Sequence, residues 1–345
     1  MPYCLNSSPI GVLEPCCTGG KTVGGQDGRP TPTGVLEPCC TGGKTVGGQD
    51  GRPTPHSPSQ ALLARIMYIR FGFDIAYSFA QPTEMIMMLY THPSRSAALL
   101  APERLHSEPP TVIEDFTDVY GNRCARTFCQ GGVLHFLNDG IIVDSGLPDP
   151  LTPEARQHSI RELPPDTLLY LLGSRYCEIE KLSEVAWELF GQVPTGWMRV
   201  QAICDWVHNH ITFEHESARC DRTAHDTFLD HRGVCRDYTH LAITFCRCMG
   251  IPARYATGYL GDIRVPLAPP MDFSAWFEVY LGGAWHTFDA RNNQPRVGRI
   301  LMARGRDAAD VALTTTFGKH VLKCFEIWAD EVPETAQIPD DRDMW

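Results

Sequence analysis

The segment RGVCRDYTHLAITFCRCMGIPARYATGYL, residues 232–260, narrows the choice of fold more than any other stretch of the chain. Gly233 lies two residues before Cys235, and an apolar pattern with helical spacing follows the cysteine. Gly250 and Pro252 end the pattern, as a helix C-cap and a helix-breaking residue do. The segment therefore predicts a helix whose first turn contains Cys235.

A cysteine in the first turn of a helix has a chemical consequence. The unpaired N–H groups and the dipole at the helix N-terminus stabilise a thiolate, which lowers the thiol pKa and raises reactivity. Taken alone, a cysteine is more often a small buried apolar residue. The position of Cys235 favours an active-site thiol instead. Such a nucleophile normally needs an imidazole beside it and a carboxylate or amide that orients the imidazole.

Two strands further along the chain offer a frame for these partners. The runs FSAWFEVYL and AWHTFDAR flank two glycines, which predicts a hairpin with a two-residue turn. This turn pairs Leu281 with Ala284 and so places Trp276 opposite Asp289. Alternation puts Ser274 on the same face, which makes Ser274 and Asp289 diagonal neighbours within side-chain reach. Trp276 is expected to be a core aromatic residue that could also wall a cleft.

Four sequence blocks, in this order and spacing, resemble the transglutaminase-like superfamily, in particular its bacterial two-domain members with an N-terminal β domain. The blocks are GVCRD at 233–237, GIPARYATGYL at 250–260, DFSAWFEVYL at 272–281 and WHTFDAR at 285–291. The resemblance covers residues 67–330 or so. It implies a papain-like α/β core and acyl transfer or amide hydrolysis through a Cys, His, Asp triad, with no cofactor.

The resemblance also implies roles for individual residues. The family's nucleophile falls on Cys235 and its orienting carboxylate on Asp289, whereas its histidine falls on Ser274. A hydroxyl titrates far above neutral pH, so it can neither act as the general base nor form the ion pair that keeps the cysteine ionised. The substitution therefore bears on turnover and not on the fold.

Other histidines could supply the missing base. His286 lies an odd number of positions from the family's aspartate on the same strand, so it points to the opposite face of the sheet. His240 follows Cys235 by five residues and lies about 140° around the helix, which favours a structural role. His225 and His231 lie in the segment that leads to the nucleophile and remain candidates for the cleft.

A second cluster, His208, His210, His215 and Cys220, suggests a zinc site. His208 and His210 are two residues apart on a predicted helix, so they face different directions. A solvated helix end is the favoured interpretation, and no metal is predicted.

The rest of the chain divides into segments of different character. From Met67 onward, short alternating runs separated by Pro, Gly and Asn predict an antiparallel β domain. After a proline-rich linker, LSEVAWELF and GWMRVQAICDWVHNHI have helical spacing. The expected fold class is α+β, with an N-terminal antiparallel β domain before a papain-like, transglutaminase-like α/β core. The predicted parts are a repeat tail at 1–66, the β domain at 67–150, a helical connection at 151–195, the core at 196–330 and a C-terminal tail at 331–345.

The N-terminal tail carries an internal repeat. The unit GVLEPCCTGGKTVGGQDGRPTP occurs twice without a change, at 11–32 and 34–55. Rich in Gly and Pro and poor in apolar residues, it cannot offset the entropy of ordering, so residues 1–66 are predicted to be disordered. Its GGKT lacks the leading glycine and the strand of a phosphate-binding loop, and its adjacent cysteines lack zinc-knuckle spacing.

Composition argues against two classes of partner. A formal net charge of −11 and the lack of clustered Lys and Arg argue against nucleic acid. No apolar run reaches the roughly 18 residues that a membrane span needs. Fourteen cysteines without a signal-peptide pattern favour a reducing cytoplasm.

Two functions are consistent with these features. The first is a cytoplasmic cysteine hydrolase or acyltransferase that acts on a peptide or amide substrate through Cys235. Hydrolysis is favoured because the sequence has no acidic calcium loop of the EF-hand type. The second is a non-catalytic descendant, a pseudoenzyme that keeps the cleft as a peptide-binding module. Neither reading fixes an oligomeric state.

Overall fold

A computed structural model describes residues 11–13, 66–268 and 271–337 of the chain. Within these ranges the fold is α+β, with an antiparallel β domain and a helical core that has its own sheet. None of the described helices is long and apolar enough to cross a bilayer.

The β domain consists of two antiparallel sheets. Its strands are β1 (Gly11–Leu13), β2 (Met67–Phe79), β3 (Thr83–Met87), β4 (His106–Glu108), β5 (Ile113–Thr117), β6 (Arg123–Cys129), β7 (Gly132–Asp144), β14 (Thr314–Thr316) and β15 (His320–Val332). The strand orders are β15-β2-β7-β4 and β1-β14-β3-β6-β5. Phe71, Phe73 and Ile75 alternate along β2 and share one apolar cluster with Met85 and Met87 of β3, so the two sheets bury a common core.

Two strands of this domain come from far downstream. β14 pairs with β3, and β15 pairs with β2 from His320↔Phe79 to Val332↔Tyr68. The segment predicted as the core, 196–330, therefore contributes strands to the β domain, and the range 67–150 does not contain all of that domain.

The N-terminal tail was expected to lack secondary structure through residue 66. Strand β1 is an exception, because it pairs antiparallel with β14 from Gly11↔Thr316 to Leu13↔Thr314. The other predictions for the tail, including those on the GGKT motifs and the paired cysteines, concern residues outside the described ranges, as does the end of the C-terminal tail.

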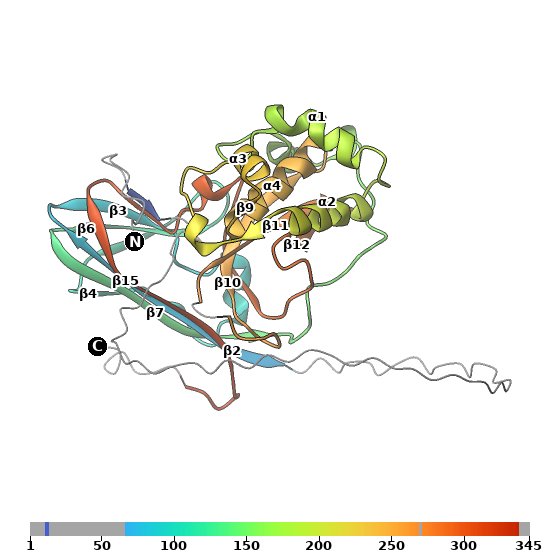
Figure 1. Cartoon of the computed structure of the whole chain (residues 1–345). Coiled ribbons are helices and arrows are strands. Elements are labelled where there is room, and N and C mark those ends of the chain that lie inside the picture. Colours follow the sequence, from blue (N-terminus) through green and yellow to red (C-terminus); the bar gives the residue numbers. More distant parts are fainter. Residues whose placement is uncertain (1–10, 14–65, 269–270, 338–345) are drawn as a thin grey trace, which may run out of the picture. The chain divides into compact units, whose positions relative to one another are not determined.

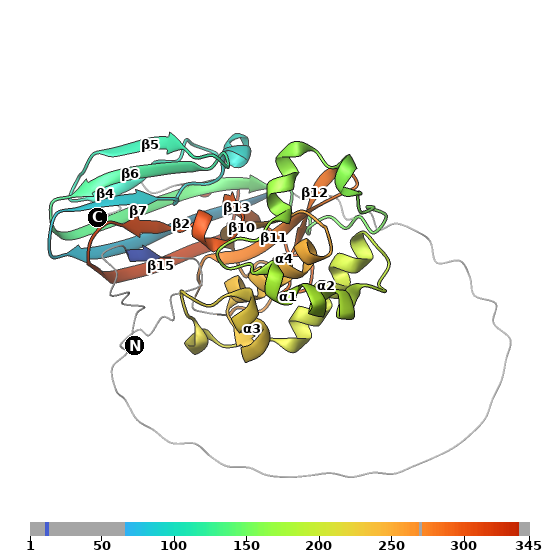
Figure 2. The same cartoon turned by 90° about the horizontal axis from the view of Figure 1, so that it is seen from above.

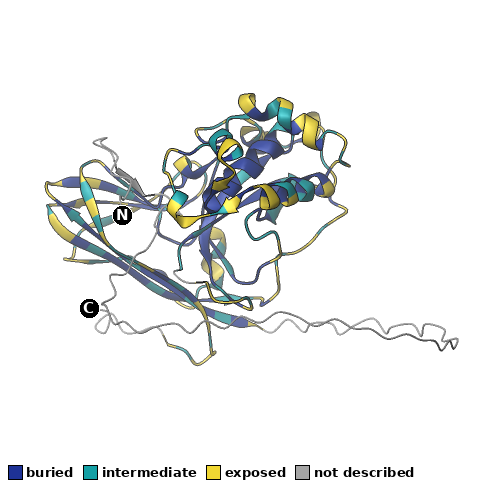
Figure 3. Ribbon diagram, viewed as in Figure 1, coloured by how far each residue is buried: buried dark blue, intermediate teal, exposed yellow. Residues whose placement is uncertain are grey.

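Four helices and a four-stranded antiparallel sheet form the core. The helices are α1 (Ile179–Phe190), α2 (Trp197–His210), α3 (Ala224–Asp230) and α4 (Cys235–Cys248). The strands are β10 (Ala253–Leu260), β11 (Ser274–Leu281), β12 (Ala284–Phe288) and β13 (Arg299–Gly305), in the order β12-β11-β10-β13. Helix α4 contacts β10, β11 and the other three helices. Figure 3 shows it as a buried rod among helices with exposed outer faces.

Shorter elements complete the described fold. A two-stranded parallel pair joins β8 (Thr212–Phe213) to β9 (Arg232–Gly233). The 3-10 helices are η1 (Pro93–Ala98), η2 (Ile160–Glu162), η3 (Pro165–Leu171), η4 (His215–Ser217) and η5 (Ala308–Asp310).

The core sheet is covered on both faces. Ala275, Phe277 and Val279 of β11 belong to the apolar cluster around α4. Tyr259 and Ile300, on β10 and β13, belong instead to the cluster of the β domain. Figures 1 and 2 show the helices α1–α4 on one side and the long strands β2, β7 and β15 on the other. The two parts therefore share a continuous interior.

Two local predictions are confirmed. Helix α4 begins at Cys235 and ends at Cys248, and Gly250 follows with a φ of 71°, a value that favours glycine. The hairpin β11–β12 has the expected register, from Leu281↔Ala284 to Phe277↔Phe288.

Candidate active site

Cys235 is the first residue of α4 and is 4% exposed. The turn before it is tightly packed, because the Asp237 carboxylate accepts a hydrogen bond from the Val234 N–H at 2.9 Å. A Cβ on Gly233 would come within 2.6 Å of the Asp237 Cβ, so this position requires glycine. Arg222 approaches the same carboxylate at 3.7 Å. These contacts fix the helix start that presents the sulfur.

Cys235 is disulfide-bonded in the structure. A disulfide sulfur carries no thiolate, and the thiolate is the form that attacks a carbonyl carbon. Any chemistry at this position therefore begins with reduction of the disulfide to a thiol.

A cavity of about 70 Å³ connects Cys235 with the residue at the family's histidine position. Cys235 lines it from the start of α4, and Ser274 lines it from the first position of β11. Asp272 and Arg291 add opposite charges to the wall, and His215 adds an imidazole. The cavity is therefore lined by Cys235, by the Ser274 hydroxyl position and by His215, a histidine that the sequence analysis assigns to a solvated helix end.

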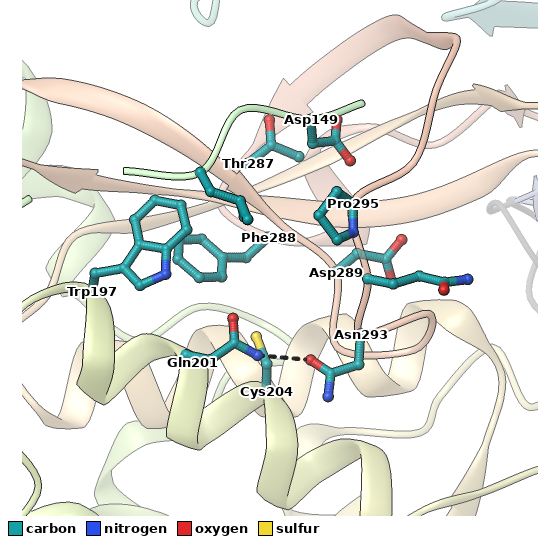
Figure 4. A pocket seen from close by; sticks show the side chains of 11 residues that line it. Asp149, Trp197, Gln201, Cys204, Thr287, Phe288, Asp289, Asn293 and Pro295 are labelled. Atoms are coloured by element: carbon teal, nitrogen blue, oxygen red, sulfur yellow. Dashed lines mark hydrogen bonds between the residues drawn. The ribbon is translucent and has the colours of Figure 1, made fainter. Parts of the chain in front are cut away.

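Asp289 lines a different cavity, of about 50 Å³, together with Cys204 and Trp197. Figure 4 shows Asp289 below Pro295 and, lower in the same cavity, the Gln201 amide donating a hydrogen bond to the side-chain oxygen of Asn293 at 3.0 Å. Cys235 and Asp289, the residues at the family's nucleophile and carboxylate positions, therefore line different cavities.

The Asp289 carboxylate is held by residues that the sequence did not suggest. It accepts hydrogen bonds from the Asn292 N–H at 2.9 Å, the Asn292 side-chain amide at 2.8 Å and Arg299 Nη2 at 2.8 Å. Burial pushes the pKa of this carboxyl upward, but Arg299 and Asn292 outweigh burial and hold the pKa below its usual range. Asp289 is therefore an ionised, fixed group at neutral pH.

Arg299 links Asp289 to two further groups. It also contacts Asp149 at 2.9 Å, and its guanidinium carbon lies 5.0 Å from the centre of the Trp276 ring. The hairpin ladder ends at Phe277↔Phe288, one position before Trp276 and Asp289, so the predicted pairing of these two residues lies just beyond it. Yet the groups hydrogen-bonded to the Asp289 carboxylate are Asn292 and Arg299, and Ser274 is not among them.

Trp276 is 2% exposed and packs with Ala256 and Leu301. It lines a third cavity with Glu278 and Arg304 and does not line the one at Cys235. The structure therefore supports its reading as a core aromatic residue.

The histidines considered from the sequence lie in other settings. His240 is fully buried, accepts the Ala308 N–H at Nε2 at 3.1 Å, and stacks on Tyr176 with ring centres 5.0 Å apart. Burial, followed by Arg236 and Arg247, holds the pKa of His240 well below its usual range. These are packing contacts, and His240 does not line the cavity at Cys235.

Three other histidines surround the core without lining the cavity at Cys235. His225 lies on α3, and His231 ends that helix with a φ of 53°. His286 pairs with Val279 and packs edge-on against Trp197, on the helix side of the sheet.

The members of the suspected zinc cluster point to separate partners. His208 lies within hydrogen-bonding distance of the Arg291 carbonyl oxygen, at 2.8 Å, and His210 stacks on Trp206. Among the described residues, no group of three or more His, Cys, Asp or Glu is arranged to hold a metal ion. His215 alone of this set lines the cavity at Cys235.

Comparisons with known proteins agree with this architecture. The family model of the transglutaminase-like superfamily matches residues 185–290. A crystal structure from Cytophaga hutchinsonii, described as a "putative cysteine protease", is 30% identical with a TM-score of 0.68, covering 79% of this chain and 93% of that chain. The chain belongs to the transglutaminase-like superfamily.

Curated relatives match over a shorter region. Uncharacterised proteins of Mycobacterium leprae and Mycobacterium tuberculosis are each 30% identical, over 116 and 115 residues. The matches cover 33% and 30% of this chain and span 42% and 37% of those proteins, less than half of their length.

Proposed function

We propose that the protein is a cysteine hydrolase or acyltransferase that acts on peptide or amide bonds through the reduced thiol of Cys235. The observation that carries the proposal is the position of Cys235 at the first residue of α4, on the wall of a cavity. At this position the helix N-terminus stabilises the thiolate, and the cavity gives a carbonyl group room to approach the sulfur.

The reaction proposed is acyl transfer. The Cys235 thiolate attacks the carbonyl carbon of an amide, the amine leaves, and water or an acceptor amine resolves the thioester. Ser274 is proposed to hydrogen-bond a water or a substrate group in the cavity, since a hydroxyl both donates and accepts. A reducing cytoplasm, as expected from the cysteine pattern, would maintain the thiol.

The test uses the whole chain after treatment with dithiothreitol. Wild type and Cys235→Ala are compared on a panel of peptide p-nitroanilides and primary amides. Cys324→Ala is the matched control, because Cys324 is a free thiol of β15 whose pKa burial raises to about 11. We expect turnover in wild type and in the control and none in Cys235→Ala. Equal turnover in Cys235→Ala and wild type would rule out this function.

Two observations favour a second function, a peptide-binding module without turnover. Ser274 stands at the family's histidine position, and Asp289 is held by Arg299. Under this function no variant turns over any amide, and reduced wild type and Cys235→Ala bind the same immobilised peptides with equal affinity. Peptide binding without turnover in reduced wild type would support it.

A further inference from the structure

The parallel pair β8–β9 brings His215 alongside Cys235. Phe213 is the register partner of Gly233, and the Glu214 N–H donates to the Gly233 carbonyl at 3.1 Å. Neighbouring strands lie about 4.8 Å apart. His215 and Cys235 each lie two residues beyond this register pair, and each is the first residue of a helix, η4 and α4. The β8–β9 pair therefore brings the two residues to the same end of these strands, although 20 positions separate them in the sequence.

The side chains of the two residues also meet the same space. Both line the cavity of about 70 Å³, which Ser274 closes from β11. The His215 ring is held edge-on to Phe213, with ring centres 4.8 Å apart. His215 is exposed on its other side, so it lies at the rim of the cavity, where an imidazole can exchange protons with solvent.

We propose that His215 is the general base of Cys235, in place of the histidine that Ser274 replaces. This inference rests on the proposed function and names the general base that the proposed reaction requires. Of the histidines among the described residues, His215 is the one that lines the cavity with Cys235. His215 is the first residue of η4, whereas the family's histidine position is the first residue of β11.

The proton transfers balance as follows. The neutral imidazole of His215 takes the proton of the Cys235 thiol, and the thiolate forms a C–S bond with the amide carbonyl carbon. As the C–N bond breaks, the imidazolium returns the proton to the leaving nitrogen. His215 then takes a proton from water, which attacks the thioester and releases a carboxylic acid while the thiol is regenerated. A dithiol reductant supplies the initial reduction of the disulfide.

The charges around the cavity suit a neutral base. Burial and then Arg291, whose guanidinium lies 4.2 Å from the centre of the Phe213 ring, hold the pKa of His215 below 6.5. Asp262 and Asp272 are the carboxylates that line the same cavity, and Cys235 is the remaining titratable group. A neutral imidazole at pH 7 can accept a proton, and the Arg291 cation favours the thiolate that results.

The experiment compares reduced wild type with His215→Gln and with His225→Gln as the matched control. If His215 is the base, kcat on the amide panel falls by about 100-fold or more in His215→Gln, the usual contribution of a general base, and stays within about 2-fold in the control. Added imidazole should restore part of the activity of His215→Gly in proportion to its unprotonated fraction. A purely structural role would not give this rescue. Wild-type turnover in His215→Gln would overturn the inference and leave the proposed function standing.

If reduced wild type turns over no amide, the proposed function is wrong, but the claim that His215 acts on the Cys235 thiol can still be tested by a second measurement. The rate of Cys235 alkylation by iodoacetamide is followed against pH for wild type and His215→Gln. Because His215→Gln lacks the nearby imidazole, the inflection of its alkylation profile should differ from that of wild type by about one pH unit. Coincident profiles would overturn the inference.

Discussion

At the scale of single residues, Ser274 separates this chain from its family's triad. It lies opposite Gly258 on β10, so no β-carbon crowds it from that neighbouring strand. Its hydroxyl reaches the cavity of Cys235, but it has no lone pair basic enough to accept the thiol proton at neutral pH. The residue at the family's histidine position therefore still lines the cavity of Cys235, but it provides no general base.

We predict that Ser274→His raises turnover of reduced protein on an amide substrate. An imidazole at this position adds a base on the wall of the cavity, with an expected gain of up to about 100-fold, the lower end of what a general base contributes. Ser274→Gln is the control, because it adds similar bulk without a base. The gain should be largest in the His215→Gln background, measured as kcat. A Ser274→His protein no faster than Ser274→Gln would contradict the prediction.

The buried pair of Asp289 and Arg299 is a second residue-scale feature. Their side chains are 4% and 8% exposed and meet at 2.8 Å. Because the folded pKa of Asp289 lies below the unfolded value of 3.8, its ionised form stabilises the fold above that pH. This stabilisation is lost as the pH falls through the folded pKa.

We predict that Arg299→Met destabilises the protein by about 3–5 kcal/mol at neutral pH, because it leaves a buried carboxylate without its cation. In this variant burial raises the folded pKa of Asp289 above 3.8, so the ionised carboxylate destabilises the fold instead of stabilising it. The loss should be full at pH 7 and shrink towards about pH 4, where the carboxyl protonates. Urea unfolding at both pH values measures it, and Asp289→Asn in the same background should recover part of the loss. An equal loss at both pH values would refute this account.

At the scale of elements, periodicity and turn chemistry carried the sequence predictions that hold. Helix α4 and the hairpin β11–β12 have strong local signals, an apolar helical pattern closed by Gly250 and a two-glycine turn that sets the register. The family resemblance then supplied the order of these elements. Fold class and the positions of Cys235 and Ser274 follow from such local patterns.

Other features had no local signal. β8 and β9 are two-residue strands, too short for any alternation, so the pairing that brings His215 to Cys235 depends on the tertiary fold. Arg299 is one arginine among many, and only the strand order β12-β11-β10-β13 brings β13 into the sheet that presents Asp289. Likewise, the pairing of β15 with β2 joins segments about 250 residues apart, which only the tertiary fold brings together.

At the scale of the whole molecule, the β domain and the core are joined by their interiors. Ile300 of the core sheet and Ile327 of β15 belong to one apolar cluster with Phe71 of β2. Strand β15 reaches this cluster only after the chain has completed the core. Parts that share buried surface in this way are expected to unfold together.

We predict that Ile327→Ala destabilises both parts in parallel. Ile327 is 9% exposed, and loss of its buried methyl groups should cost about 2 kcal/mol or more. Urea midpoints are measured by tryptophan fluorescence and by alkylation of the buried Cys246 in α4. Both midpoints should shift equally, whereas Val321→Ala, at a 46% exposed position of the same strand, should shift neither. A fluorescence shift without a Cys246 shift would show that the parts unfold separately.

The central claim is that Cys235 is an activated thiol once it is reduced. The most direct test is the pH dependence of its alkylation by iodoacetamide in dithiothreitol-treated protein from which the reductant has been removed, followed by mass spectrometry of the peptide that contains it. We predict an inflection at or below about pH 7.5, within the range of thiols stabilised at helix N-termini. An inflection near about 8.5, the value of an ordinary cysteine, would contradict it.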